Sequence, residues 1–328
     1  FAAISGSTIV NAVVFTRIAY PQMIKYGYSR SLSIGCIAAT GSFAAMIPPS
    51  ITMVIFAIMT DQSVGRLLIA GILPGILTAT IYMIGVWGIV SLKPSLAPTI
   101  TEGVNRRKRW QFTLKIWPML MLIVLIMGGL YAGIFPASAA GAAGAFGAFC
   151  IALWRKRGSF GWLPKVLEDA AAISCVIFII LIGGLILSRM LVVVGVIDHI
   201  TEQITSIATT PMRFMILICV LYLILGCFLD TTSMMVVTLP FLFPVTVALK
   251  MDPIWFGIII VKLVEISTVT PPVGVNLFAV LGAAGKETDF HQVSMGVLPF
   301  IGLEIIVLAL LVAFPEITLW LPNQMMGK

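Results

Sequence analysis

The chain of 328 residues is 60% hydrophobic and only 10% charged, with a mean hydropathy of +1.11. Soluble domains carry roughly 25% charged residues, so this composition excludes a water-soluble globular protein and predicts helices that span a lipid bilayer. The net charge of +7 does not indicate nucleic-acid binding, because the basic residues form short clusters between apolar stretches, at 106–109 and 155–157.

The first part of the chain predicts an apolar arm, a broken helix and a continuous span, at residues 1–20, 32–60 and 66–91. The arm follows a polar turn at 5–8. The broken helix is interrupted at Pro48-Pro49, because Pro49 lacks an N–H and its ring disfavours helix at the preceding residue. We expect these elements to form a first repeat over 1–91, followed by a basic cytoplasmic loop at 92–113.

The rest of the chain, residues 114–328, is predicted to form a second repeat. Its expected parts are scaffold spans within 114–191, a hairpin at 212–249, a broken helix at 254–282 and a span at 292–314. The hairpin has its tip at Asp230-Thr231-Thr232, and the helix is broken at Pro271-Pro272.

The two parts match each other in sequence. A shift of 223 positions places Pro48-Pro49 on Pro271-Pro272, Pro21 on Pro244 and Thr8 on Thr231 without a gap. A shift of 225 places Gly71-Ile-Leu-Pro on Gly296-Val-Leu-Pro. So many matches in order, among 18 prolines, indicate an internal repeat.

The distribution of basic residues predicts the topology. If residues 1–20 return from a hairpin that opens to the cytoplasm, four loops lie on that side, at 16–31, 92–115, 155–165 and 284–291. These loops hold fourteen of the 20 Lys and Arg residues, and the opposite side holds four. The second hairpin then opens outward, so the repeats are inverted. The unmatched scaffold spans imply that roughly 110 further residues precede Phe1.

Each repeat exposes backbone polar groups at a hairpin tip and at a proline break. Such groups must be satisfied inside the protein or by a ligand. Carbonyls and small hydroxyls suit Na⁺, and the helix starts near Ser50 and Gly274 suit an anionic group. Asp230 is the one acid in either tip, so we interpret it as a cation ligand. The alternative role, a cap for the following helix, is compatible with that interpretation.

Other polar residues in the spans remain open to two interpretations. Asn11 and Asn276 lie just past a tip and a break, where each either contacts substrate or caps free carbonyls. Lys262 and Glu265 stand one helical turn apart and are expected to pair with each other. Glu304 has no evident partner in the last span.

The motifs at Gly41–Ser50, Leu68–Gly75, Phe228–Thr232 and Thr270–Asn276 resemble the large membrane subunit of tripartite ATP-independent periplasmic (TRAP) transporters. The resemblance covers essentially the whole chain. It implies an all-α, elevator-type protein of the bacterial inner membrane that imports an organic acid with Na⁺. It also implies two partners, a small four-helix membrane subunit and a soluble periplasmic substrate-binding protein, and no enzymatic activity.

The predicted site residues combine this resemblance with the positions of the tips and breaks. The predicted cation-binding residues are Ser5, Ser7, Ile47, Pro48, Asp230, Thr231, Thr270, Val273 and Gly274. The predicted substrate-binding residues are Ser7, Asn11, Ser50, Thr232 and Asn276. The family often carries Thr-Pro-Thr-Glu-Ala where this chain has Pro136–Ala140 without an acid, so the role of that Glu does not carry over.

Two alternatives to the TRAP assignment remain. A stand-alone Na⁺-coupled dicarboxylate symporter has the same plan of hairpins and would need no binding protein. An intramembrane hydrolase using Ser5 or Ser7 is disfavoured, because no intramembrane His or suitably placed Lys is available as a base.

Overall fold

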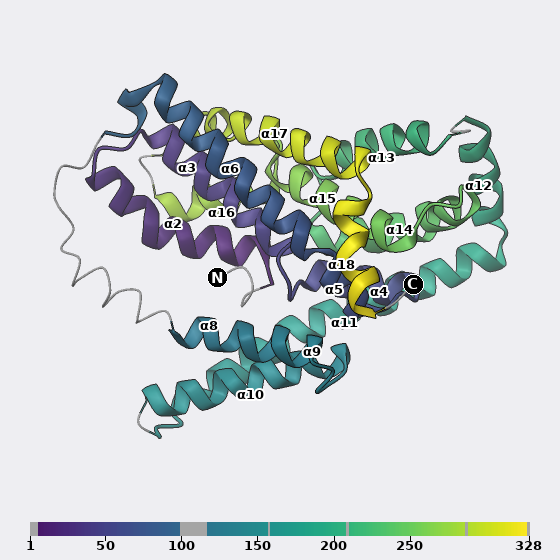
Figure 1. Cartoon of the computed structure of the whole chain (residues 1–328), viewed down its shortest axis with the longest axis horizontal. Coiled ribbons are helices and arrows are strands. Elements are labelled where there is room, and N and C mark those ends of the chain that lie inside the picture. Colours follow the sequence, from purple (N-terminus) through teal and green to yellow (C-terminus); the bar gives the residue numbers. More distant parts are fainter. Residues whose placement is uncertain (1–5, 99–116, 157, 208–209, 286–287, 327–328) are drawn as a thin grey trace. The chain divides into compact units, whose positions relative to one another are not determined.

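The computed structural model describes residues 6–98, 117–156, 158–207, 210–285 and 288–326. The described residues contain helices and turns and no strand, which confirms the predicted all-α class (Figure 1). The chain divides into two compact units. Unit 1 comprises Phe1–Ile100 and Leu187–Lys328, and unit 2 comprises Thr101–Ile186.

The N-terminal part of unit 1 forms α2 (Thr8–Lys25), α3 (Arg30–Gly41), η1 (Ser42–Ala45), α4 (Ile51–Thr60), α5 (Val64–Ala70), α6 (Ile72–Leu92) and η2 (Pro94–Leu96). Four of these helices begin in the same way, with a serine side chain that accepts the N–H of the residue three positions later. The capping residues are Ser7, Ser29, Ser50 and Ser63. Each cap satisfies a backbone donor that the first helical turn leaves free.

The C-terminal part of unit 1 forms α12 (Val196–Ile207), α13 (Pro211–Leu225), α14 (Thr231–Ala248), α15 (Pro253–Val269), α16 (Val275–Ala284), α17 (Phe290–Ala313) and α18 (Glu316–Met326). Thr210 and Asp252 cap helices whose first residue is proline, a position where the missing N–H costs nothing. Helix α18 was not predicted from the sequence. The helix is short and contains Pro322, so its residues show no clear helical periodicity.

The helix bounds extend the correspondence found in the sequence. Helices α2 and α14 each have 18 residues and each contain one matched proline, Pro21 or Pro244. Helices α4 and α16, which follow the two breaks, each have 10 residues. The Pro48-Pro49 and Pro271-Pro272 bonds are both cis. The two copies therefore share element lengths as well as proline positions.

The two breaks differ in where the preceding helix ends. Helix α15 runs to Val269, directly before the second break, as the prolines predict. Helix α3 ends earlier, at Gly41, and the chain continues as the 3-10 turn η1 before Pro48. Ser42 Oγ donates to the Ala39 carbonyl, which satisfies an acceptor at the end of α3. The first break is therefore longer than the proline pair alone indicated.

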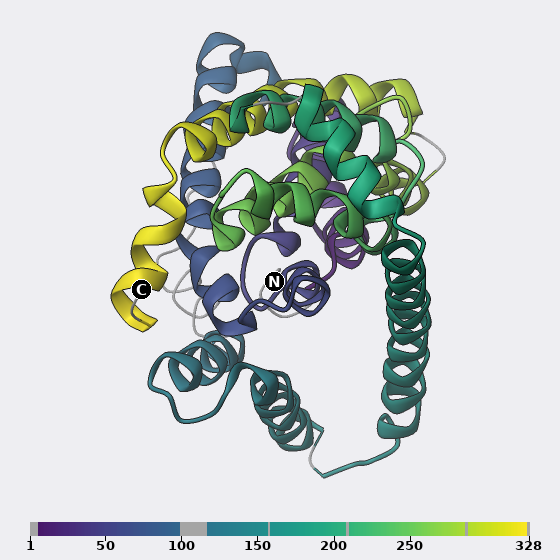
Figure 2. The same ribbon diagram turned by 90° about the vertical axis from the view of Figure 1, so that its right-hand side faces the viewer.

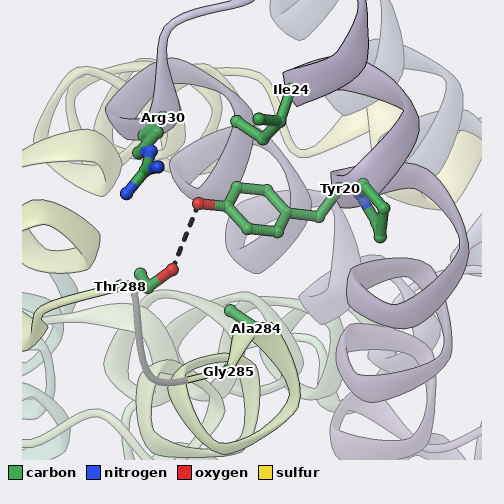
Figure 3. A pocket seen from close by; sticks show the side chains of 7 residues that line it. Tyr20, Ile24, Arg30, Ala284, Gly285 and Thr288 are labelled. Atoms are coloured by element: carbon green, nitrogen blue, oxygen red, sulfur yellow. Dashed lines mark hydrogen bonds between the residues drawn. The ribbon is translucent and has the colours of Figure 1, made fainter.

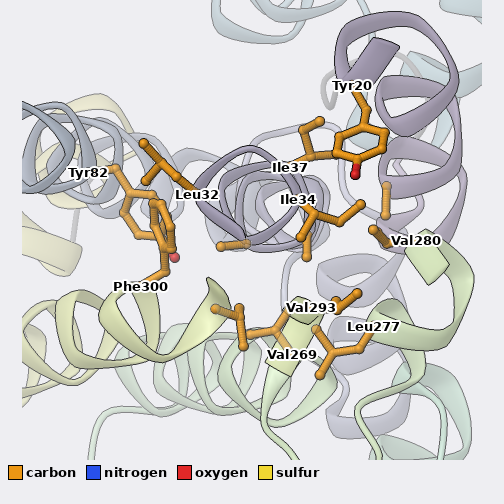
Figure 4. Close-up of a cluster of buried hydrophobic side chains, with 14 residues drawn as sticks. Tyr20, Leu32, Ile34, Ile37, Tyr82, Val269, Leu277, Val280, Val293 and Phe300 are labelled. Atoms are coloured by element: carbon orange, nitrogen blue, oxygen red, sulfur yellow. The ribbon is translucent and has the colours of Figure 1, made fainter. Parts of the chain in front are cut away.

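The core of unit 1 is built from both copies. Helix α3 packs along α17 and α2 packs along α16, so purple and yellow-green segments lie side by side in Figures 1 and 2. Apolar side chains from these helices and from α6 fill the space between them, including Ile34, Val293 and Phe300 (Figure 4). A Cβ on Gly35 would lie 2.0 Å from the Gly296 carbonyl oxygen, so α3 and α17 approach at backbone distance.

Unit 2 consists of α8 (Trp117–Ile123), the π turn η3 (Val124–Gly128), α9 (Gly129–Tyr131), α10 (Ala137–Arg155) and the first part of α11 (Leu163–Val193). Gly144 and Gly147 of α10 face Ile126 and Leu125, and Trp117 contacts Trp154 edge to face. The spans expected at 114–134 and 136–154 are thus helical where the structure describes them.

Four helices among the described residues are long and apolar enough to cross a membrane, namely Val64–Leu92, Leu163–Val193, Thr231–Ala248 and Phe290–Ala313. Val64–Leu92 comprises α5 and α6. An 18-residue helix is about 27 Å long, close to the hydrocarbon thickness of a bilayer. The chain is therefore a multi-pass helical membrane protein.

Candidate functional site

The first proline break is held together by Ser50. Its Oγ accepts the Met53 N–H at 3.3 Å and donates to the Ala45 carbonyl at 2.5 Å. One buried hydroxyl therefore both caps α4 and closes the gap that Ile47, Pro48 and Pro49 leave in the backbone ladder. The helix start expected near Ser50 is observed, with Ile51 as the first residue of α4.

The segment predicted as the first hairpin tip lies against this break. Gly6 adopts a φ of 60°, and a Cβ there would lie 3.4 Å from the Pro49 carbonyl oxygen. Ser7 caps α2, with its Oγ 3.5 Å from the Val10 N–H, and Asn11 is buried one turn further on. The structure thus places the tip beside the break. Ser5, predicted as a ligand, lies outside the described residues.

The second break requires a glycine at its end. Gly274 has a φ of 58°, and a Cβ would lie 3.1 Å from the Thr268 carbonyl oxygen and 3.0 Å from Leu277 Cγ. Thr270 ends α15 and donates to the Ile266 carbonyl at 2.6 Å. Val273 is partly buried between them. The chain therefore turns back on the end of α15 before α16 begins at Val275.

The Asn276 side chain reaches across the second break, and only its amide nitrogen has a partner there. Its Nδ2 lies 3.5 Å from Thr268 Oγ1, while its buried Oδ1 has no hydrogen-bond partner among the described residues. A fully buried side-chain carbonyl without a donor is unfavourable unless a ligand completes it. This orphaned acceptor is the feature of the site that points most directly to a bound cation or a hydrogen-bond donor.

The second hairpin tip carries the acid predicted as a cation ligand. Asp230 is partly buried and caps α14, accepting the N–H groups of Thr232 at 3.0 Å and Ser233 at 3.5 Å through Oδ2. Thr231 is the first residue of α14. Near the tip, a Cβ on Gly226 would overlap Ser267, and Ser267 Oγ lies 3.8 Å from Met234 Sδ. The second tip is thus packed on the last turns of α15.

The helix after each break packs on a helix of the other copy. Helix α4, which follows the first break, packs on α14, the arm after the second tip. Helix α16, which follows the second break, packs on α2, the arm after the first tip. Each predicted site is therefore built with a helix of the other copy beside it.

A group of buried charged side chains lies outside the predicted site residues. Lys262 Nζ donates to Glu265 Oε2 at 2.8 Å, which confirms the predicted pair, and to Thr78 Oγ1 at 3.1 Å. The prediction that Glu304 has no partner is wrong. Glu304 forms an ion pair with Lys262 and accepts a hydrogen bond from Tyr82 Oη at 2.7 Å. These contacts join positions up to 222 residues apart, and no local spacing indicated them.

A cavity of about 440 Å³ lies between the C-terminal part of α2, the start of α3 and the end of α16. Tyr20, Ile24 and Arg30 line one side, and Ala284, Gly285 and Thr288 line the other (Figure 3). Tyr20 Oη lies 3.1 Å from Thr288 Oγ1 across it. Tyr20 is twelve residues beyond Thr8, about 18 Å along α2, so this cavity is separate from the tip and the break.

Broken helices, each accompanied by a hairpin tip, within an all-helical membrane protein define the class of repeat-built transporters. Residues 1–317 match the family described as "Tripartite ATP-independent periplasmic transporter, DctM component". The chain is 33% identical to a C4-dicarboxylate TRAP transporter large permease protein of Vibrio cholerae, covering 100% of this chain and 76% of that protein. The chain belongs to this family of TRAP large permease proteins.

Other relatives carry different substrate names. An ectoine TRAP transporter large permease protein of Halomonas elongata is 30% identical over 98% of this chain and 74% of its own length. An isethionate TRAP transporter permease protein of Oleidesulfovibrio alaskensis is 31% identical over 98% of this chain and 50% of its own length. These relatives are transporter permeases rather than enzymes, so the intramembrane hydrolase is rejected.

Proposed function

We propose that the intact protein imports an organic acid across the bacterial inner membrane, driven by a Na⁺ gradient. The observation that carries this proposal is the pair of breaks, each with a predicted hairpin tip packed near it, together with the buried Asn276 Oδ1 at the second break, which has no hydrogen-bond partner among the described residues. Such paired discontinuities at membrane depth are typical of secondary transporters that couple an ion to a solute. Movement of the hairpins and broken helices against a scaffold is then elevator-like.

The residues present suit Na⁺, a hard cation that oxygen ligands bind. We assign a first Na⁺ site to Ser5, Ser7 and the backbone around Ile47 and Pro48. We assign a second site to Asp230, Thr231, Thr270, Val273 and Gly274. Support comes from the Thr268 carbonyl against Gly274 and from the buried, unpartnered Asn276 Oδ1 beside it.

The substrate is proposed to lie between the two breaks, with its anionic group toward the starts of α4 and α16. A helix N-terminus favours negative charge because its first N–H groups lack intrahelical acceptors. Ser7, Asn11, Ser50, Thr232 and Asn276 are the proposed substrate contacts. The relatives are named for three different solutes, C4-dicarboxylate, isethionate and ectoine. The proposal for this chain is therefore a binding site for a small organic solute, without a choice among these three.

The carboxylate of Asp230 can be tested separately from its capping role. Asn caps a helix about as well as Asp but carries no charge. We expect Asp230→Asn to abolish Na⁺-stimulated uptake in liposomes while the protein still folds, and Asp230→Ala to do the same with an additional loss of about 1 kcal/mol of stability. Undiminished Na⁺ dependence in Asp230→Asn removes the assignment.

Asp252 supplies the matched control. It caps α15 through the same pair of contacts, accepting the N–H groups of Ile254 at 2.8 Å and Trp255 at 3.0 Å, but it lies in the turn after α14, away from both tips. Asp252→Asn should leave Na⁺-stimulated uptake unchanged. If both Asp→Asn variants lose uptake equally, the loss reflects a damaged fold.

The proposed partners are a small four-helix membrane subunit and a soluble periplasmic substrate-binding protein. One relative is named as a combined DctMQ permease, which supports a second membrane subunit. We expect liposomes that contain both membrane subunits to take up substrate only when the loaded binding protein is added. Uptake at the same rate without it would favour the stand-alone dicarboxylate symporter.

A further inference from the structure

Five buried polar side chains from three helices form what we call the Lys262 cluster. Lys262 and Glu265 come from α15, Glu304 comes from α17, and Thr78 and Tyr82 come from α6. The three charged side chains are 0% exposed, and Thr78 and Tyr82 are 1% and 3% exposed. None of the five belongs to the proposed Na⁺ or substrate sites.

The charges in the Lys262 cluster do not balance. Two carboxylates and one ammonium group leave one net negative charge when all three are ionised. A charged group that is buried at membrane depth is unfavourable unless an opposite charge compensates it. The cluster therefore calls for one more positive charge.

The hydrogen-bond donors in the cluster are also fully used. Lys262 has three N–H groups, and its three partners are Thr78, Glu265 and Glu304. Thr78 donates its own hydroxyl hydrogen to the Pro74 carbonyl at 2.8 Å, and Tyr82 donates to Glu304. Glu265 Oε1 is buried and has no hydrogen-bond partner among the described residues. An oxygen without a donor thus lies in the same place as the missing positive charge.

Neighbouring elements do not supply that charge. Met46, whose N–H also faces the Glu265 carboxylate, donates to the Phe43 carbonyl. Cys36 of α3 faces Tyr82, Tyr222 of α13 lies 2.7 Å from Thr238, and Arg66 of α5 donates to Asn323 of α18. Among the described residues, the remaining charged groups of the helices packed against the cluster stand at helix ends. They are Arg30, Asp61, Lys93, Arg213, Asp230, Lys250, Asp252, Asp289 and Glu316, and His291 lies in the first turn of α17.

We propose that the Lys262 cluster is a binding site for one proton, shared between the carboxyl groups of Glu265 and Glu304. The proton makes the cluster neutral and supplies the missing donor. Because both carboxyl groups contact the Lys262 ammonium group, the bound proton belongs to the pair rather than to one residue. The site lies where α6, α15 and α17 meet, and its five residues are distinct from those assigned to Na⁺ and to substrate.

Infrared spectroscopy of the intact transporter tests this site directly. A protonated carboxylic acid has a C=O stretch that an ionised carboxylate lacks. At neutral pH the wild type should show the band of one buried protonated carboxyl group per chain. Glu265→Gln and Glu304→Gln should each abolish it, because one carboxylate and one ammonium group already balance. Glu316→Gln, an exposed position outside the cluster, should leave the band unchanged.

Three results would overturn the proposal. The first is a wild-type spectrum at neutral pH without such a band. The second is a band that persists in both Gln variants. The third is a band that appears only when Na⁺ is removed, which would make Na⁺ the occupant. If a Gln variant fails to fold, the wild type alone decides, since the band of a buried acid must exchange its proton for deuterium far more slowly than exposed groups do.

Discussion

At the scale of single residues, the breaks depend on side chains that do two tasks at once. Ser50 caps α4 and closes the first break, and Asp230 caps α14 in the place where a cation ligand is expected. Both residues could be found from the sequence, because small polar residues before apolar helices are typical caps. Glu304 could not be interpreted from the sequence, because its partners Tyr82 and Lys262 come from other helices.

Gly274 offers a residue-scale test of the second break. Its φ is positive, and any Cβ at this position would press against the Thr268 carbonyl oxygen and the Leu277 side chain. We expect Gly274→Ala to lower the free energy of unfolding by at least about 1–2 kcal/mol, the usual cost of placing a non-glycine residue in the left-handed region. Thermal unfolding of both proteins in detergent measures this loss of stability.

Gly282 is the matched control for that substitution. It lies within α16, the helix that follows the second break, and a Cβ there would meet nothing within 4 Å. Gly282→Ala should be neutral or stabilising by up to about 1 kcal/mol, because Ala is the better helix former. Equal destabilisation by both substitutions would contradict the role given to the Gly274 backbone.

At the scale of elements, the crossing of α3 and α17 brings the two copies together at backbone distance. A Cβ on Gly296 would lie 2.2 Å from the Ser31 carbonyl oxygen, and backbone cannot move aside as a flexible side chain can. Small residues that let helices approach at backbone distance are typical of membrane proteins. This crossing fixes where α17 lies and therefore where Glu304 lies.

The crossing predicts a strong effect of one methyl group. Gly296→Ala should separate α3 from α17 and lower stability by about 1–3 kcal/mol, as overpacking does in well-packed cores. Gly302→Ala, six residues further along α17, meets nothing within 4 Å and should be tolerated. Melting temperatures of the two variants, compared with the wild type, check the difference. Similar values for both would show that the crossing is less tight than the backbone distances indicate.

Much of the element pattern followed from the sequence, and the reasons are local. Prolines and capping residues act on their own segment, so the starts of α4, α14 and α16 could be predicted. The early end of α3 at Gly41 could not be predicted, since it depends on the packing of η1 against α2 and α15. The contacts between α4 and α14 and between α16 and α2 are equally non-local and carried no sequence signal.

At the scale of the whole molecule, the inverted arrangement of the repeats remains a prediction from charge. Lys93 follows α6, and Lys250 lies in the turn between α14 and α15. The positive-inside rule places the loop of Lys93 in the cytoplasm, and the same trace places Lys250 on the opposite side. The two positions are exposed, so they can report on topology.

Cysteine labelling tests that topology. The five native cysteines are first replaced by serine. In this background, a membrane-impermeant thiol reagent added outside intact cells should label Lys250→Cys, and it should label Lys93→Cys only after the membrane is permeabilised. Labelling of both positions from the same side would refute the inverted trace.

The exchange of neighbours between α4 and α14 and between α16 and α2 limits how the protein can be divided. Neither half of unit 1 contains a complete set of packing partners, so a polypeptide ending after α6 would expose the face of α4 that α14 covers. The halves therefore fold as one cooperative body, and a substitution in one arm changes the support of the opposite break. A change in the length or tilt of α4 or α16 would therefore disturb the arm of the other copy that packs on it.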